Sequence, residues 1–142
     1  MPVALKRAYE KASRADGTRV LVDRLWPRGV PKRAAAIDAW LKSLAPSHAL
    51  RRWFHARPRQ WPLFRKRYLA ELGAPDACGA LEELYRLAED SRQLTLVFAA
   101  RDPEHNNAVV LKELLEGMRK PPSSSGPFAA GARVQARVAR RR

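Results

Sequence analysis

A continuous apolar run late in the chain restricts the possible folds more than any other feature. Residues 94–100, with the sequence LTLVFAA, lack the alternation of polar and apolar side chains that marks a half-exposed strand. A strand of this kind is buried on both faces, as in a parallel sheet covered by helices. Residues 19–23, which are apolar at Val20, Leu21 and Val22, and residues 3–9, which alternate loosely, predict two further strands.

The spacing of apolar residues between these strands predicts four helices. Ile37, Trp40, Leu41 and Leu44 mark the first helix, which Pro46 ends. The next three helices are predicted to begin at a capping residue or at a first-turn proline, namely Ser47, Pro58 and Asp76.

A fifth helix is predicted after the last strand. Asp102, Pro103 and Glu104 have the order of an N-cap, a first-turn proline and a first-turn acid. Its buried face is predicted from the apolar residues at helical spacing, which are Ala108, Leu111, Leu115 and Met118. The whole pattern predicts an α/β fold with a small, mainly parallel sheet flanked by helices.

The composition changes after residue 118. Residues 121–127, with the sequence PPSSSGP, are typical of a linker. Residues 119–142 hold seven of the 28 Lys and Arg residues and none of the 14 acidic residues. We therefore expect a single α/β domain over residues 1–118, followed by a disordered, flexible and basic tail over residues 119–142.

The formal net charge of +14 bears on partners rather than on the fold. A basic body with a basic tail attracts polyanions such as nucleic acid, without implying sequence recognition, so weak nucleic-acid binding is one expectation. The alternative is that these cations only keep the protein in solution. No apolar run is long enough to span a bilayer, so no membrane partner is expected.

The compartment is predicted from what the sequence contains. The first residues, with the sequence MPVALKR, do not have the pattern of a secretory signal. A single cysteine, Cys78, cannot form an internal disulfide. We expect a cytoplasmic protein.

Candidate functional residues gather where the strand at residues 19–23 ends. Asp23 is followed by Arg24, Trp26, Arg28 and Lys32. Several cations around one carboxylate favour an anionic ligand, because arginine grips phosphate or carboxylate through two hydrogen bonds. Asp23 is either the structural partner of an arginine or a general base. The Trp26 side chain either fills the core or stacks on a ligand.

A second group of candidates follows the strand at residues 94–100. Arg101 could bind an anion, and His105 is the second acid–base candidate. Asn106 and Asn107 are poor helix formers, so they are expected to pin the neighbouring loop or to contact a polar ligand. If the two strands are parallel, both groups lie at one edge of the sheet.

Other kinds of site have no support in the sequence. The histidines, His48, His55 and His105, do not have the spacing of metal ligands. The chain has neither a glycine-rich phosphate loop nor a nucleophile elbow. We therefore predict no metal and no cofactor.

Three strings together give the chain a family resemblance. They are RVLVDRLWPRGV at residues 19–30, AWLKSLAPS at residues 39–47 and AARDPEHNNA at residues 99–108. In this order they resemble the YeaO-like family, a domain of unknown function numbered 488. The likeness covers residues 3–118, and the family motif usually has an aromatic residue at the place of Thr18. It implies a small cytoplasmic α/β protein and brings no catalytic mechanism with it.

Three hypotheses for the function follow. The leading one is an anion- or nucleotide-binding domain, with or without enzymatic activity, whose ligand is an anionic or phosphate-containing small molecule. The second is a non-enzymatic protein that binds nucleic acid without sequence specificity through its basic surface and tail. In the third, the charged cluster is only a lattice of salt bridges that joins two loops.

Overall fold

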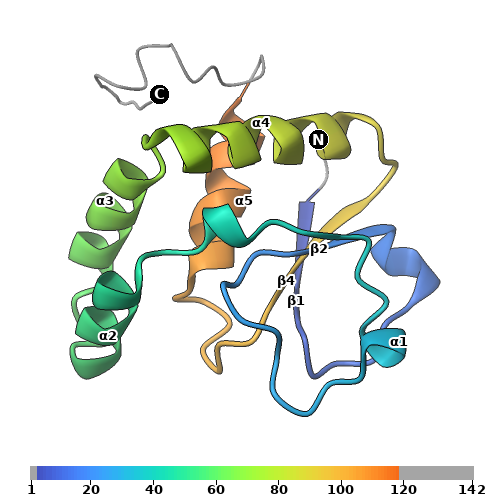
Figure 1. Cartoon of the computed structure of the whole chain (residues 1–142), viewed down its shortest axis with the longest axis horizontal. Helices are drawn as coiled ribbons and strands as arrows, with labels where there is room; N and C mark the ends of the chain where they lie inside the picture. Colours follow the sequence, from blue (N-terminus) through green and yellow to red (C-terminus); the bar gives the residue numbers. More distant parts are fainter. Residues whose placement is uncertain (1–2, 119–142) are drawn as a thin grey trace. The chain divides into compact units, whose positions relative to one another are not determined.

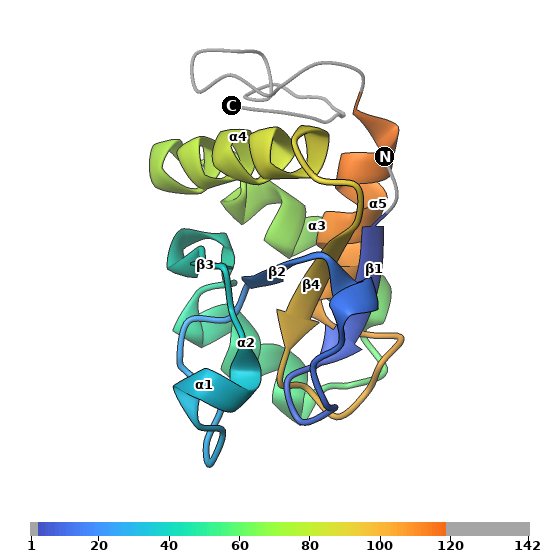
Figure 2. The same ribbon diagram turned by 90° about the vertical axis from the view of Figure 1, so that its right-hand side faces the viewer.

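The apolar run at residues 94–100 forms an interior strand of a four-stranded sheet. In the computed structural model, strand β4 (Leu94–Phe98) pairs with β1 (Val3–Arg7) on one side and with β2 (Thr18–Leu21) on the other. A short strand, β3 (Ala39–Trp40), adds to β2, so the order is β1-β4-β2-β3. All three pairings are parallel, and every residue of β4 is buried. The predicted α/β class with a small parallel sheet is confirmed (Figures 1 and 2).

The structure describes residues 3–118, which fall into two compact units. The first unit joins residues 3–45 to residues 84–118 and contains the sheet. The second contains residues 46–83 and is helical. The predicted basic tail at residues 119–142 lies outside the described residues, and the extent of one domain over residues 1–118 stays a prediction.

Helix α5 (Asn107–Gly117) packs against β1 and β4 in the first unit (Figure 2). Its buried residues include Ala108, Leu111 and Leu115, as the helical spacing predicts, whereas Met118 is half-buried just beyond the helix end. The Nζ of Lys112 donates a hydrogen bond of 2.8 Å to the carbonyl oxygen of Val3, which joins the helix to the first strand.

The predicted start of this helix is wrong. Its N-cap is Asn106, whose side-chain oxygen accepts a hydrogen bond of 3.1 Å from the Val109 backbone N–H. Asp102 instead accepts bonds from the backbone N–H groups of Glu104 and His105 in a separate turn. Both Asp and Asn suit an N-cap, so composition alone does not distinguish the two positions.

The helix predicted from Ile37 to Leu44 is also wrong. Residues 39 and 40 form β3, and only Lys42–Leu44 make a short 3-10 helix. Hydrogen bonds to β2 account for the extended backbone: the Asp38 N–H donates to the Arg19 carbonyl at 2.8 Å, and the Arg19 N–H donates to the Asp38 carboxylate at 2.8 Å. Sheet pairing thus overrides the helical spacing of the apolar residues.

The second unit begins with helix α2 (His48–Ala56), whose predicted cap is confirmed. The Ser47 hydroxyl accepts a bond from the Leu50 N–H and donates one of 2.6 Å to Glu71 near the end of helix α3 (Trp61–Glu71). Helix α3 begins three positions after Pro58, because Pro62 rather than Pro58 occupies its first turn. Helix α4 (Pro75–Glu89) begins just before Asp76 and runs on into the first unit.

A buried ion cluster lies before β2 in the first unit. Asp16, at the end of a 3-10 turn (Arg14–Asp16), pairs with Arg19 at 2.7 Å and with Lys6 at 3.0 Å. Its backbone carbonyl accepts a bond from the Thr95 hydroxyl in β4. Burial opposes the charge of Asp16, but hydrogen bonds from the Ser13 N–H, Lys6 and Arg19 outweigh it, and the net effect lowers the pKa of Asp16 below its ordinary 3.8.

Replacing Asp16 with Asn is expected to destabilise the fold by about 3 kcal/mol, because it leaves a buried arginine without its counter-charge. Since the folded state lowers the pKa of Asp16, the stabilisation is complete at neutral pH and is lost as pH falls below about 3.8. Urea unfolding at several pH values measures both effects. Asp90→Asn, at an exposed position, is the control; an equal loss in both variants would contradict the cluster's role.

Gly17 is required where the chain turns into β2. Its backbone has φ +65° and ψ −133°, a conformation open mainly to glycine. A Cβ at this position would overlap the backbone carbonyl of Gln93, the group that accepts a bond from the Thr18 N–H. Both strain and overlap therefore oppose any side chain here.

Gly17→Ala is expected to lower the free energy of unfolding by more than about 2 kcal/mol. Gly29→Ala is the matched comparison, because Gly29 also has a positive φ of +79° but its added Cβ would meet nothing within 4 Å. That variant should lose only about 1 kcal/mol from backbone strain. Thermal unfolding compares the two variants. Similar losses of stability would show that the overlap with the Gln93 carbonyl contributes little.

Candidate functional site at the strand ends

The two predicted loops meet at the carboxyl edge of the sheet. The Ala99 N–H, just after β4, donates a hydrogen bond of 2.9 Å to one oxygen of the Asp23 carboxylate. The side-chain amide of Asn107 donates to the other oxygen at 3.2 Å and to the Val22 carbonyl at 3.0 Å. The predicted convergence is therefore confirmed. We call residues 22–32 together with residues 99–107 the strand-end edge.

Asp23 and Asn107 act here as a bridge between the two loops. Asn107 is 8% exposed and opens α5, so its amide is held by a helix that packs on the sheet. Asp23 is half-buried and accepts a hydrogen bond from the backbone N–H of Ala99, at the end of the neighbouring strand. Of the two expectations for the asparagines, Asn107 pins the neighbouring loop, while Asn106 caps the helix and donates to the Asp102 carbonyl at 2.8 Å.

Arg7 contacts the strand-end edge from β1, a role that the sequence did not predict. Its guanidinium, at the end of β1, donates to the carbonyls of Ala100 at 2.9 Å and Ala99 at 3.3 Å. The parallel register places Arg7 opposite Phe98, the last residue of β4. An arginine at the end of a predicted strand beside another strand end was the available signal.

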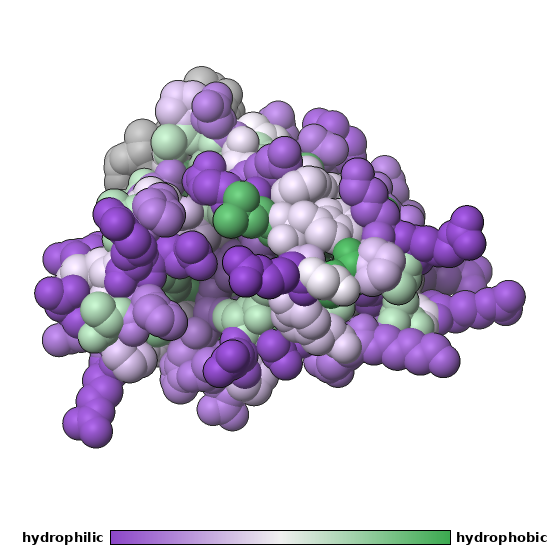
Figure 3. Space-filling view, turned by 60° about the horizontal axis from the view of Figure 1, so that its bottom comes forward, coloured by the Kyte–Doolittle hydropathy of each residue, from purple (hydrophilic) through white to green (hydrophobic). Residues whose placement is uncertain are grey.

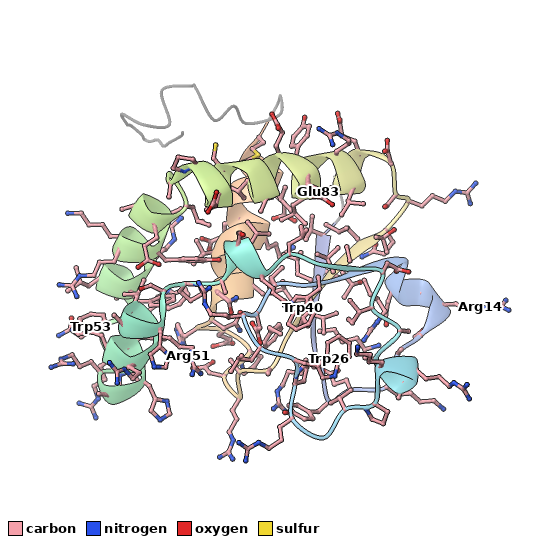
Figure 4. The ribbon with its side chains drawn as sticks, viewed as in Figure 1. Arg14, Trp26, Trp40, Arg51, Trp53 and Glu83 are labelled. Atoms are coloured by element: carbon pink, nitrogen blue, oxygen red, sulfur yellow. The ribbon has the colours of Figure 1, made fainter. Side chains whose placement is uncertain are left out.

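Trp26 packs beneath the first loop together with Trp40. The two rings meet edge to face, with centroids 5.5 Å apart and planes at 68°, and Figure 4 shows them next to one another. Both lie against a buried cluster of Ala8, Leu21 and Val97. The Trp26 indole N–H donates to the Val30 carbonyl and that of Trp40 to the Asp23 carbonyl, each at 2.7 Å. These contacts match the core-filling interpretation of Trp26.

His105 lies against Asp102 at the surface of the second loop. Its Nδ1 is 2.9 Å from the Asp102 carboxylate, and the Asp102 side chain is 55% exposed. The hydrogen bond from the Glu104 backbone N–H is the main cause that lowers the pKa of Asp102, and the bond with His105 adds to it. The local turn thus orients the imidazole of His105.

The predicted cations of the edge are exposed to solvent. These residues are Arg24, Arg28, Lys32 and Arg101. Within residues 3–118, no hydrogen bond or ion pair ties down the side chains of Arg28, Lys32 and Arg101. The Arg24 guanidinium lies 3.5 Å from the Ala45 carbonyl. Figure 3, in which the lower end of Figure 1 comes forward, shows hydrophilic side chains over most of this face.

The described residues hold neither a group of metal ligands nor a membrane-spanning helix. No group of three or more His, Cys, Asp or Glu side chains within residues 3–118 is arranged to hold a metal ion. No helix in the same part of the chain is both long enough and apolar enough to cross a membrane. A cytoplasmic location stays a prediction.

Comparison with known proteins decides the family. A family model described as "Inactive DUF488-N3 subclade" matches residues 2–127. The chain belongs to this DUF488 subclade. The match extends past Met118, where the resemblance of the motifs ends, so the DUF488 region includes the start of the predicted tail.

Relatives support the same DUF488 assignment. The chain is 40% identical over 120 residues to the uncharacterized protein YeaO of Escherichia coli (strain K12), an alignment that covers 83% of this chain and 100% of YeaO. It is 41% identical over 115 residues to the uncharacterized protein Rv3073c of Mycobacterium tuberculosis (strain ATCC 25618 / H37Rv), covering 81% of this chain and 94% of that protein. The YeaO-like resemblance is confirmed. No solved structure matches the chain.

Asn107→Asp is expected to destabilise the fold by about 3 kcal/mol, because it sets a second carboxylate against Asp23 and the Val22 carbonyl and removes their donor. Gln60→Glu is the control, because it makes the same amide-to-carboxylate change at an exposed position before α3, where the side chain caps no backbone group. That variant should change stability by less than about 1 kcal/mol. Urea unfolding of both variants tests the bridge, and equal effects would show that Asn107 does not hold the loops together.

Proposed function

We propose that this protein is a non-catalytic binding protein that holds a phosphate-containing small molecule at the strand-end edge. One observation carries the proposal. The hydrogen bonds of Asp23 and Asn107 fix two loops to one edge of the sheet, while Arg28, Lys32 and Arg101 extend from those loops into solvent. A rigid backbone that carries exposed cations suits recognition of an anion.

The charge of the first loop supports an anionic ligand. Residues 24–37 contain four basic side chains and no acidic one. Pro27 and Pro31 limit the backbone freedom of the loop, and the Trp26 indole closes it through its bond to Val30. Because the loop is already ordered, less conformational entropy is lost when a ligand binds. The guanidinium of arginine donates two parallel hydrogen bonds, and this geometry matches two oxygens of a phosphate group.

An apolar group beside the cations supports a nucleotide over a bare phosphate. Leu25 is 69% exposed, although it lies between Arg24 and the packed Trp26. A nucleobase placed over Leu25 would remove apolar surface from water while its phosphates contact the neighbouring cations. The ligand class we propose is therefore a mononucleotide or a comparable phosphate ester.

The acid–base candidates support binding rather than catalysis. Both oxygens of Asp23 accept hydrogen bonds that hold the fold, so this carboxylate has a positioning role. His105 directs Nδ1 toward Asp102 in the same surface turn. The description of the family as an inactive subclade agrees with this assignment.

Titration calorimetry with AMP, pyrophosphate and inorganic phosphate tests the proposal. The double variant Arg28→Ala/Arg101→Ala should weaken AMP binding at least about tenfold, since each lost charge-assisted hydrogen bond is worth about 1.5 kcal/mol or more. Arg92→Ala is the control, because Arg92 is exposed but precedes β4 at the opposite end of the strand. If the intact protein binds none of the three probes, or if the control loses as much affinity, the proposal is wrong.

A further inference from the structure

Helices α2 and α3 carry a concentration of positive charge that the strand-end edge does not include. Residues 48–70 contain seven Lys and Arg residues and no Asp or Glu. The next acidic residue, Glu71, accepts hydrogen bonds from the Ser47 backbone N–H and hydroxyl at 2.7 and 2.6 Å. This carboxylate therefore joins the start of α2 to the end of α3. No acidic residue lies between the cations of residues 48–70.

The packing of the two helices turns these cations outward. Phe54 of α2 stacks on Phe64 of α3 with ring centroids 4.4 Å apart, and Trp61 lies 5.8 Å from Phe54. Leu50 and Tyr68 are buried on the same inner faces. Because the aromatic side chains occupy the inside of the hairpin, the remaining face of each helix is polar and exposed. Six of the seven cations within residues 48–70 are exposed: Arg51, Arg52, Arg57, Arg59, Lys66 and Arg67. We call these six residues the hairpin basic surface.

Trp53 orders two of the six guanidiniums. The Arg67 guanidinium lies 4.3 Å from the centre of the indole, and that of Arg57 lies 5.6 Å from it. Arg57 also approaches the Trp53 carbonyl at 3.5 Å. A guanidinium held over an aromatic ring still has N–H groups at its own edge that can donate to a ligand. Its side chain is already ordered, so less conformational entropy is lost when a ligand binds. Figure 4 shows Trp53 and Arg51 on different sides of α2, so the charge is spread around the helix.

We propose that the hairpin basic surface binds the phosphate backbone of nucleic acid. Helix α3 has 11 residues and is about 16 Å long, a length over which duplex DNA presents about nine backbone charges. Two of the six cations, Lys66 and Arg67, lie on α3, and the other four lie on α2 and in the turn that joins it to α3. Gln60 is the one amide side chain within residues 48–70, so the surface has few groups suited to reading base edges. Binding is therefore expected to be independent of sequence.

The exposed surface of the hairpin argues against a membrane as the occupant. A helix that lies on a lipid bilayer needs an exposed apolar face beside its cations. Among the described residues, the exposed large hydrophobic side chains are Tyr9 and Leu25, and neither lies in α2 or α3. This inference does not rest on the proposed ligand of the strand-end edge, because the two surfaces share no residue.

Salt-dependent binding of the full chain to a short duplex DNA, a duplex RNA and a single-stranded RNA tests the inference. The triple variant Arg52→Gln/Arg59→Gln/Lys66→Gln leaves the Trp53 pair intact and removes three cations. If each contacts a phosphate, the slope of log affinity against log salt for duplex DNA should become shallower by about 2.7. Circular dichroism confirms that the variant is folded.

A control variant separates the surface from net charge. Lys11→Gln/Arg86→Gln/Arg92→Gln removes the same number of exposed cations from the first unit and keeps residues 119–142 unchanged. Its slope should match that of the unaltered protein. Arg28→Ala/Arg101→Ala should also retain duplex binding, whatever its effect on AMP. Equal loss in the hairpin variant and its control, absence of binding at low salt, or binding of polyglutamate as tight as that of DNA would each overturn the inference.

Discussion

The strand-end edge depends on the hydrogen bonds that the Asp23 carboxylate accepts. Parallel strands place their ends side by side, but nothing in the sheet itself prevents the connections that follow from diverging. The Asp23 side chain accepts one hydrogen bond from a backbone N–H just after β4 and another from the Asn107 amide at the start of α5. The loops at residues 22–32 and 99–107 are therefore joined into one structure, and their cationic side chains extend from a fixed backbone.

Charge has two different uses in this chain. Buried or half-buried charged groups, such as Asp16 with Arg19 and Arg7 at the end of β1, hold backbone and partner groups in place. Other cations are exposed, such as Arg28, Lys32 and Arg101 at the strand-end edge and Arg52, Arg59 and Lys66 on the hairpin basic surface. The net charge of +14 thus does not describe one uniform basic coat. It includes both cations that hold the structure and cations that are exposed to solvent.

Sequence reasoning succeeded where one physical signal dominated. The unbroken apolar run of β4 predicted burial on both faces, and parallel geometry then placed Asp23 beside Asn107 without any contact being visible in the sequence. It failed at Ile37–Leu44, where apolar spacing matched a helix but pairing with β2 decided the backbone. Arg7 was missed although its place at a strand end was a signal, because its carbonyl partners lie 92 and 93 residues away along the chain and meet it only in the sheet. Arg19 pairs with Asp16, only three residues away, but the burial of this pair was not visible in the sequence. Asp102 and Asn106 have equal capping ability, so only the packed position of α5 distinguishes them.

The strand order also sets when the protein can acquire its sheet. The neighbours β1 and β2 along the chain are never paired; β4, made almost 75 residues after the end of β2, inserts between them. During synthesis β1 has no strand to pair with, and β2 has only β3, until that late segment emerges. Loop closure over such a separation slows folding, and the nascent chain is exposed to aggregation in the interval. A chain cut before Leu94 would keep only the short β2–β3 pairing and would leave β1 without a neighbouring strand.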